Sequence, residues 1–241
     1  MGDNFEERWN MRRILSIILV FSLLAVPVAR AEGERYVALT FDDGPSGRFT
    51  RRLLADLEER QVLATFLLCG YRMELYPKLT RQIFEAGHEI GLHGYSHTDM
   101  ATLSGKELHR EIRDTRALLP EGCEPVFFRP PGGVVTDGVR QVAEARQLAL
   151  LSWSVDPKDW ATTSVGSIET AVLKRIQDGD IILLHDMSVS SVQAALDVVD
   201  VLQEQGFQFV TVSELAKLRK VPIRPGRMYE RFPPAADETV S

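Results

Sequence analysis

The chain has 241 residues, of which 44% are apolar and 26% charged, and its 28 basic and 34 acidic residues give a formal charge of -6. This length fits one sizeable α/β domain, which can bury a core without disulfide or metal staples. Nucleic-acid binding is disfavoured, because the chain has neither a basic surplus to displace counterions nor a basic stripe.

The first 31 residues have the pattern of a secretory signal peptide. Arg12 and Arg13 precede an uncharged run, and Ala29 and Ala31 stand at the two positions that a signal peptidase reads. The run is shorter than the about 20 apolar residues of a membrane span, so an uncleaved anchor is the second interpretation and a buried N-terminal helix the third. Acidic residues before Met11 suggest that translation starts at Met11. We therefore expect an extracytoplasmic protein, secreted or associated with the cell envelope, that meets a membrane only through this segment.

After this segment, short apolar runs alternate with helical patterns. The expected strands are Tyr36–Thr40, Ala64–Leu68, Glu89–Leu92, Val126–Phe128, Leu148–Ser154, Asp180–Leu184 and Phe207–Thr211. The expected helices are Arg48–Arg60, Ser104–Leu119 with a capping box at Ser104 and Glu107, Val165–Gln177, and Ser191–Gln205.

Strands that alternate with helices predict parallel pairing with right-handed crossovers. About seven such units predict an α/β fold, a distorted (β/α) barrel over residues 32–220, with a doubly wound open sheet as the alternative. Residues 221–241 contain four prolines and are expected to form an extended or disordered Pro-rich tail.

Polar residues follow five of the expected strands. In a parallel barrel the carboxyl ends of all strands face the same rim, where active sites are built. The five segments are Thr40–Pro45, His93–His97, Arg129–Gly133, Asp156–Trp160 and His185–Asp186. We therefore expect carboxylates, imidazoles and an arginine to converge at one rim.

A metal site is the first candidate at this rim. Asp42 and Asp43 lie before Gly44 and could simply form a turn, but two adjacent carboxylates repel each other and a nearby cation would relieve this. His93 and His97 are four residues apart and would share a face on a helical turn, although such a pair is often a surface pair. With Asp43 they would supply two nitrogens and one oxygen, a catalytic pattern that leaves a position open.

The remaining rim residues allow two interpretations each. Arg129 either caps a surface loop or orients a carboxylate with its planar guanidinium. His185 is either a core histidine or an acid whose tautomer and pKa are set by a carboxylate such as Asp159. Trp160 is either core or a wall on which a sugar ring stacks.

Five other residues are expected to have no part in the site. His88 begins a strand at the far end from the rim, His109 lies among charged residues of a helix, and Trp153 lies within a strand. Cys69 follows a strand whereas Cys123 precedes one, so the two sulfurs are expected at opposite ends of the sheet and unpaired.

In these motifs the chain resembles the polysaccharide deacetylase family, carbohydrate esterase family four, also called the NodB-homology domain. The resemblance runs from Tyr36 to Leu218 and rests on five motifs in the family's order: Thr-Phe-Asp-Asp-Gly-Pro at 40–45, His-x-x-x-His at 93–97, Arg-Pro-Pro at 129–131, Asp-Pro-Lys-Asp-Trp at 156–160 and Leu-Leu-His at 183–185.

The resemblance implies a distorted barrel with fewer closed strands than eight, and a role for each matching position. These are Asp42 as general base, Asp43, His93 and His97 as metal ligands, Arg129 as the residue that orients the base, Asp159 as the residue that tunes the acid, His185 as that acid, Gly132 as a backbone donor to the oxyanion, and Leu183 as part of the acetyl-methyl pocket. The implied reaction is metal-dependent hydrolysis of the acetamide of N-acetylated sugars in a polysaccharide, peptidoglycan or chitin-like, with release of acetate.

Zinc is the expected metal, although a site with two histidines and one aspartate also takes cobalt, nickel, manganese or iron. Two positions depart from the family pattern: Gly94 replaces a hydroxyl that braces the histidine loop, and Gly132 replaces a tyrosine that walls the substrate groove. An inactive glycan-binding homologue and an O-acetyl esterase that uses the same site are the alternative functions.

Overall fold

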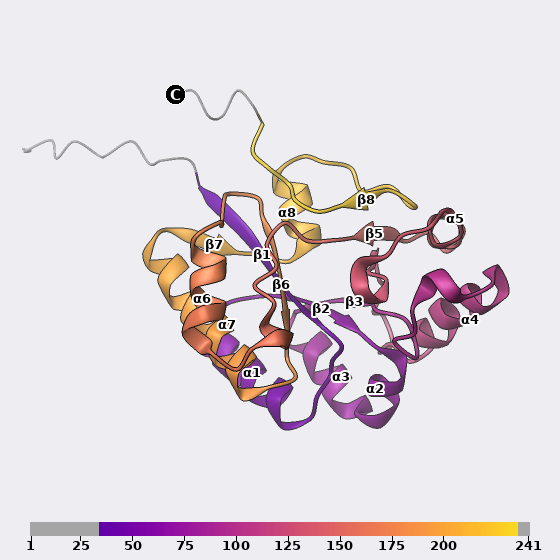
Figure 1. Cartoon of the computed structure of the whole chain (residues 1–241), viewed down its shortest axis with the longest axis horizontal. Coiled ribbons are helices and arrows are strands. Elements are labelled where there is room, and N and C mark those ends of the chain that lie inside the picture. Colours follow the sequence, from indigo (N-terminus) through magenta and orange to yellow (C-terminus); the bar gives the residue numbers. More distant parts are fainter. Residues whose placement is uncertain (1–33, 236–241) are drawn as a thin grey trace, which may run out of the picture. The chain divides into compact units, whose positions relative to one another are not determined.

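The computed structural model describes residues 34–235, in which one eight-stranded sheet is surrounded by helices (Figure 1). The strands are β1 Arg35–Asp42, β2 Thr65–Leu68, β3 Glu89–Leu92, β4 Phe127–Phe128, β5 Ala149–Leu151, β6 Ile181–His185, β7 Phe207–Phe209 and β8 Met228–Tyr229. The α-helices are α1 Arg48–Glu59, α2 Gly70–Leu75, α3 Pro77–Glu85, α4 Gly105–Arg116, α5 Asp137–Ala145, α6 Val165–Leu173, α7 Val189–Glu204 and α8 Val212–Leu218. The signal peptide expected over residues 1–31 lies outside the described residues.

The strands are paired in parallel in the order β6-β1-β2-β3-β4-β5-β8, with β7 paired to the first residues of β1. Beyond β5 the chain turns back to β6, where Val155 forms a parallel bridge with Ile182 and the Leu183 N–H donates to the Val155 carbonyl at 2.9 Å. The sheet therefore curls into a ring, which confirms the distorted (β/α) barrel predicted from the alternation of strands and helices.

Apolar residues at helical spacing explain how the outer layer is held. Leu53 and Leu57 of α1 lie one turn apart and are fully buried. Helices α1, α6 and α7 pack side by side on one part of the barrel (Figure 1), and α7 is the most deeply covered, with eight buried residues. The strands beneath them are almost entirely buried, as a parallel sheet covered by helices requires.

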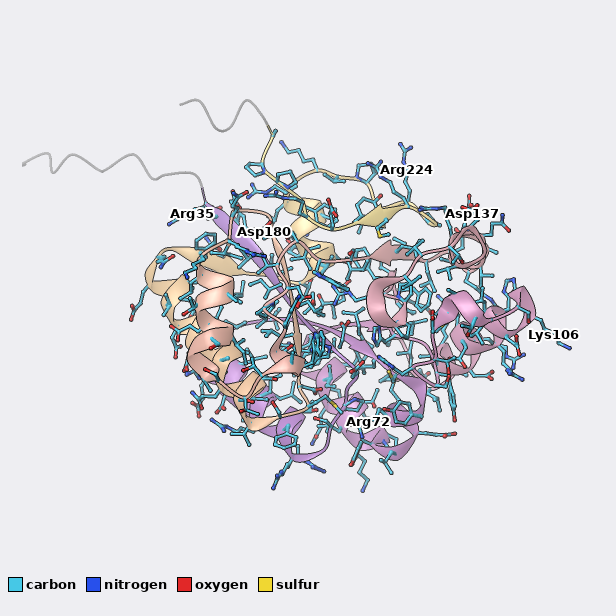
Figure 2. The ribbon with its side chains drawn as sticks, in the orientation of Figure 1. Arg35, Arg72, Lys106, Asp137, Asp180 and Arg224 are labelled. Carbon is cyan, nitrogen blue, oxygen red and sulfur yellow. The ribbon has the colours of Figure 1, made fainter. Side chains whose placement is uncertain are left out.

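Charged side chains cover the outside of the domain. Lys106, Asp137 and Arg224 are exposed and point outward at the periphery of Figure 2. Among residues 34–235, no helix has the length and apolar character required to span a membrane.

Several elements were not expected from the sequence. Helices α2, α3, α5 and α8 have six to nine residues each, too short for a strong periodic signal. Strand β8 lies in the segment expected to be an extended or disordered tail, and it pairs with β5. Tyr229 and Phe232 in this segment are buried and stack with ring centroids 5.3 Å apart. Up to residue 235 the Pro-rich segment thus forms part of the barrel wall.

Candidate active site

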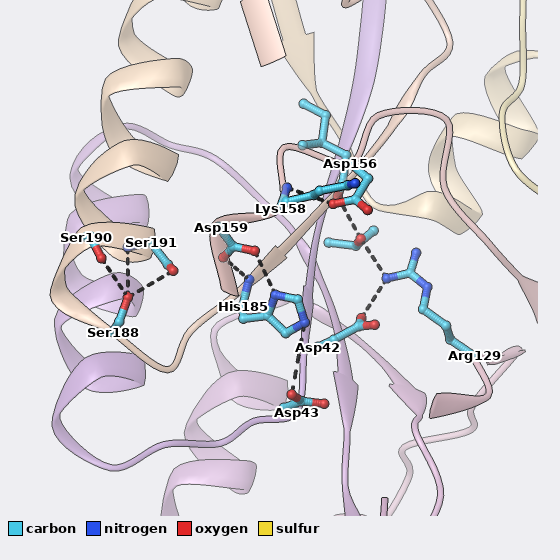
Figure 3. Close-up of polar contacts among 12 residues, drawn as sticks. Asp42, Asp43, Arg129, Asp156, Lys158, Asp159, His185, Ser188, Ser190 and Ser191 are labelled. Carbon is cyan, nitrogen blue, oxygen red and sulfur yellow. Dashed lines mark hydrogen bonds and ion pairs between the residues drawn. The ribbon is translucent and has the colours of Figure 1, made fainter. Parts of the chain in front are cut away.

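Strand register brings the polar segments to one rim. Asp42, the last residue of β1, pairs with His185, the last residue of β6. Leu92 of β3 pairs with Phe128 of β4, so His93 and Arg129 follow two neighbouring strands at the same level. Because all these strands are parallel, their carboxyl ends open onto the same side of the barrel. Figure 3 shows Asp42, Arg129 and His185 close together there.

Asp43, His93 and His97 form a group that could hold a metal ion. One ligand atom from each of them lies within 4.8 Å of those of the other two. The Nε2 atoms of His93 and His97 are 3.2 and 3.0 Å from Oδ1 of Asp43. Two ligands bound tetrahedrally at 2.0–2.1 Å from an ion lie about 3.3 Å apart, so these separations fit the edges of a coordination sphere.

The protonation of the group also fits a cation. The Nδ1–H of His93 donates to the Arg129 carbonyl at 2.7 Å, which leaves the Nε2 lone pair directed toward Asp43. Oδ1 of Asp43 is buried and makes no hydrogen bond of normal geometry. Burial alone would raise the pKa of Asp43, but the two imidazoles outweigh burial and hold that pKa far below its ordinary value. One carboxylate oxygen and two imidazole nitrogens thus converge on one point, a donor set that a divalent cation binds.

The two histidines come together differently from the sequence expectation. The chain from His93 to His97 is an irregular loop and not a helical turn. Gly94 has φ 80° and His97 has φ 57°, both in the left-handed region. A Cβ on Gly94 would lie 2.4 Å from the methyl carbon of Met100, and the positive φ is a conformation that glycine adopts without strain, so glycine favours this tight reversal. A reversal of the backbone, and not helical periodicity, brings the two imidazole rings to the same oxygen of Asp43.

Glu111 of α4 braces this loop. Its Oε2 accepts the backbone N–H groups of Tyr95 at 2.7 Å and Ser96 at 2.9 Å, and its Oε1 accepts the Ser96 hydroxyl at 2.9 Å. Glu111 carries no signal of this role in the sequence, because the residue lies fourteen positions after His97 on a helix of charged residues. Only the packing of α4 beside the loop identifies it.

Asp42 and Arg129 form a buried ion pair beside the metal group. Asp42 is 3% exposed and Arg129 is fully buried. The Arg129 Nη1 donates to Oδ1 of Asp42 at 2.6 Å and to the Thr40 hydroxyl at 2.9 Å, and its Nη2 donates to the Ser152 carbonyl at 2.8 Å. The other oxygen of Asp42, Oδ2, lies 3.7 Å from Nε2 of His93. Arg129 thus holds one oxygen of Asp42 while the second stays beside the metal group.

His185 is held by Asp159. Oδ1 of Asp159 lies 2.8 Å from the His185 Nδ1, and Oδ2 accepts the His185 backbone N–H at 2.8 Å. Burial alone would lower the pKa of His185, but the hydrogen bond and charge of Asp159, with the charges of Asp42 and Asp43, outweigh it and raise the pKa to about 9. Nε2 of His185 lies 4.0 Å from Oδ2 of Asp43 (Figure 3), so an imidazolium points into the site.

A cleft of about 670 Å³ opens beside these groups. Asp43, Asp159 and His185 line it, with Trp160 and the serines at the start of α7. Trp160 is 67% exposed, so it is a wall of the cleft and not a core residue. Leu183 is buried on β6 two residues before His185, and Gly132 lies in an exposed turn with φ 66°; neither is among the residues that line this cleft.

Residues expected to lie outside the site do so, with one difference. His88 is buried and accepts the Ala64 N–H at 3.1 Å, and His109 contacts Arg146. Cys69 and Cys123 are buried and unpaired with each other, as expected. Trp153 is only half-buried and lies outside β5. The centroid of its ring is 5.6 Å from Cζ of the Arg129 guanidinium. It therefore shields the Asp42–Arg129 pair instead of filling the core.

Comparison with known proteins decides the family. A family model described as polysaccharide deacetylase matches residues 29–151. The chain belongs to the polysaccharide deacetylase family. A peptidoglycan-N-acetylglucosamine deacetylase of Bacillus cereus is 38% identical over 192 residues, which cover 77% of this chain and 90% of the relative. A chitooligosaccharide deacetylase of Bradyrhizobium is 32% identical over 200 residues, with 76% of this chain and 91% of the relative covered.

Solved structures agree with this assignment. A family 4 acetyl xylan esterase from Clostridium thermocellum, solved with a cobalt ion, superimposes with a TM-score of 0.77 at 36% identity, over 83% of this chain and all of the esterase. The relatives include peptidoglycan and chitooligosaccharide deacetylases and an acetyl xylan esterase with a cobalt ion, which is consistent with a metal at the Asp43, His93 and His97 group.

Proposed function

We propose that the polysaccharide deacetylase described here is a metal-dependent N-deacetylase, which hydrolyses the acetamide of N-acetylated sugars in a cell-envelope glycan. The observation that carries the proposal is the convergence of three metal-ligand side chains with a held carboxylate and an imidazolium. Asp43, His93 and His97 would bind one divalent ion, zinc by the chemistry of the donors. A metal bound there would polarise the acetyl carbonyl and lower the pKa of a water molecule.

Asp42 is the proposed general base. Its Oδ1 is held by Arg129 while Oδ2 lies beside the metal group, so Oδ2 can accept a proton from the water that attacks the carbonyl carbon. Arg129 orients Asp42 and balances its charge without touching the substrate. The attack produces a tetrahedral carbon whose oxyanion would receive the backbone N–H of Gly132.

His185 is the proposed general acid. Its pKa, raised to about 9, keeps the ring protonated at neutral pH, and Asp159 fixes Nδ1 so that the proton on Nε2 faces the reaction. An amide anion is a very poor leaving group, so the carbon–nitrogen bond breaks as Nε2 gives its proton to the nitrogen. The products are acetate and a free amino sugar. Leu183 would line the acetyl-methyl pocket, and Trp160 would stack on a sugar ring.

The substrate proposal starts from the relatives. The 38% identical Bacillus cereus relative is named a peptidoglycan-N-acetylglucosamine deacetylase, so peptidoglycan is the first substrate to assay and chito-oligosaccharides the second. The signal-like pattern of residues 1–31 favours an extracytoplasmic location, where such a polymer is available.

Acetate release tests the proposal. We expect Asp42→Asn and His185→Ala each to lower kcat on the order of 10²–10⁴-fold, because each removes one proton-transfer group. Asp114→Asn and His109→Gln are matched controls on α4, outside the site, and should retain full activity. Full activity in Asp42→Asn or His185→Ala would overturn the assignment of that residue.

An O-acetyl esterase is the second candidate, favoured by the 36% identity to an acetyl xylan esterase. The same metal group and base would serve it, but an alkoxide leaves more easily than an amide anion, so ester hydrolysis depends less on the acid. Comparing N-acetyl and O-acetyl substrates with the wild type and His185→Ala separates the two. Release of acetate from O-acetyl substrates alone would reject the N-deacetylase proposal, and no release from either would favour an inactive homologue.

A further inference from the structure

Asp186 is a buried carboxylate at the rim that has no part in the proposed reaction. It follows His185 directly and is fully buried. Its Oδ2 accepts the hydroxyl of Thr50, but Oδ1 has no hydrogen-bond partner, and no ion pair to Asp186 is found among residues 34–235. Burying a carboxylate with an incomplete set of hydrogen bonds costs free energy.

The carboxylate of Asp186 packs against the loop that follows β1. A Cβ built on Gly44 would lie 2.8 and 2.9 Å from its two oxygens, so the carboxylate occupies the space that a side chain at Gly44 would need. The backbone carbonyl of Asp186 accepts the Ser46 hydroxyl. Thr50 connects the two contacts, because its hydroxyl oxygen also accepts the Ser46 N–H at 2.7 Å.

These contacts join two parts of the site that come from different strands. Gly44 follows Asp43 on the β1 loop, whereas Asp186 follows His185 on β6. Asp43 itself has φ 71°, a left-handed conformation that is uncommon outside glycine but that aspartate adopts more often than most residues. Nε2 of His185 and Oδ2 of Asp43 are 4.0 Å apart, so a small shift of either loop would change both the metal group and its distance from the acid.

We propose that Asp186, through Thr50 and the close packing on Gly44, is a positioning residue that sets Asp43 against His185. This inference rests on the proposed function for the roles of Asp43 and His185. Asp186 does not touch the substrate; it holds the β1 loop so that Asp43 reaches His93 and His97 in the geometry required for a metal ion. Loss of the contact lets the loop relax, which weakens metal binding and lowers kcat while substrate binding is retained.

Variants of Thr50 test this most cleanly, because they leave both carboxylates in place. Thr50→Val is isosteric and removes the hydroxyl, and Thr50→Ser retains it. We expect Thr50→Val and Asp186→Ala to bind zinc about 10- to 100-fold more weakly in chelator competition with the metal-free protein. We expect kcat to fall by up to about 100-fold with KM unchanged, as a misplaced group at a catalytic site does. Thr50→Ser should restore most of both.

Thr80→Val is the matched control. Thr80 is also buried on a helix, but its hydroxyl donates to the carbonyl of Tyr76, which lies outside the loop. This variant should lower the melting temperature as Thr50→Val does and leave zinc affinity and kcat unchanged. If Thr50→Val and Asp186→Ala keep wild-type zinc affinity and kcat and lose only stability, Asp186 is a structural residue and the proposal is overturned. A defect in Thr50→Val that Thr50→Ser does not rescue overturns it too.

The zinc titration also separates this inference from the proposed function. If the wild-type protein releases no acetate from any glycan but Thr50→Val weakens zinc binding, the proposed function fails and the positioning role stands. If the wild type releases acetate while zinc affinity and kcat are the same in Thr50→Val, the reverse holds.

Discussion

The two ends of the barrel treat their polar groups in opposite ways. At the amino end Glu89 accepts the hydroxyls of Thr65 and Ser213, and His88 accepts a backbone N–H from Ala64. At the carboxyl end a carboxylate oxygen of Asp43 and nitrogens of its two histidines converge on one point. Paired polar groups stabilise a fold, whereas a converging carboxylate and two imidazoles can bind a cation.

The comparison separates two kinds of variant. Changes at the amino end should alter the free energy of unfolding and leave metal binding intact. Changes at the carboxyl end should alter metal binding or the rate more than stability. The Asp42–Arg129 pair is the exception, because this pair lies at the rim but is as buried as the core.

Arg129→Met should therefore have the largest effect, a loss of stability although the residue lies at the carboxyl end. The change leaves the Asp42 carboxylate buried without its cation, and removal of one partner of a buried pair costs about 3–5 kcal/mol. Chemical denaturation of the metal-free protein measures this. Arg140→Met, which removes a guanidinium that donates to the Gly226 carbonyl, is the control and should cost less. Equal costs would mean that the pair contributes no more than an ordinary hydrogen bond.

His88→Gln, at the amino end, should change the pH dependence of stability and leave metal binding unchanged. Burial lowers the pKa of His88 from 6.5 to about 4, so the unfolded chain binds a proton in this range that the folded protein does not. The stability from neutral His88 is complete above pH 6.5 and is lost as the pH falls toward 4, by about 3 kcal/mol at 1.36 kcal/mol per pH unit. Urea unfolding at pH 7 and pH 4.5 should show a smaller loss in His88→Gln, with zinc affinity unchanged. His109→Gln is the control; a loss as large as that of the wild type in His88→Gln would contradict the prediction.

Asp159→Asn should change the pH dependence of the rate. The acid works while His185 is protonated, so the rate falls as the pH rises through the His185 pKa, which Asp159 helps to raise to about 9. Asparagine keeps an acceptor for Nδ1 but removes the charge, and the alkaline limb should move down by about one to three pH units. A pH–kcat profile with an unchanged alkaline limb would exclude His185 as the titrating acid.

Glu111→Ala should have the smallest effect. The variant removes the acceptor for the Tyr95 and Ser96 N–H groups and frees the loop that carries His97. Zinc affinity should fall by about 10- to 100-fold, the range for groups that support a metal ligand. Glu107→Ala removes the capping box of the same helix and should cost about 1 kcal/mol of stability with no change in zinc affinity. Equal zinc affinity in both variants would show that the loop needs no brace.

Much of the fold and site could be predicted because both follow short-range patterns. Strands β1 to β7 are apolar runs, and the polar residues that follow them meet because parallel strands end on the same rim. Strand β8 was missed, since Met228 and Tyr229 pair only with a strand far away in the sequence. Helices such as α2 were missed because one or two turns give no clear periodicity.

The family, the barrel and the residues that converge at its rim could be predicted from the sequence, because motif order and the positions of strand ends can be read along the chain. The tertiary structure alone decided how the convergence is built: the left-handed turn that folds His97 back onto His93, the support from Glu111, and the carboxylate of Asp186 beneath Gly44. Each of these depends on segments distant in sequence that pack within a few ångströms, and neither composition nor periodicity encodes that proximity.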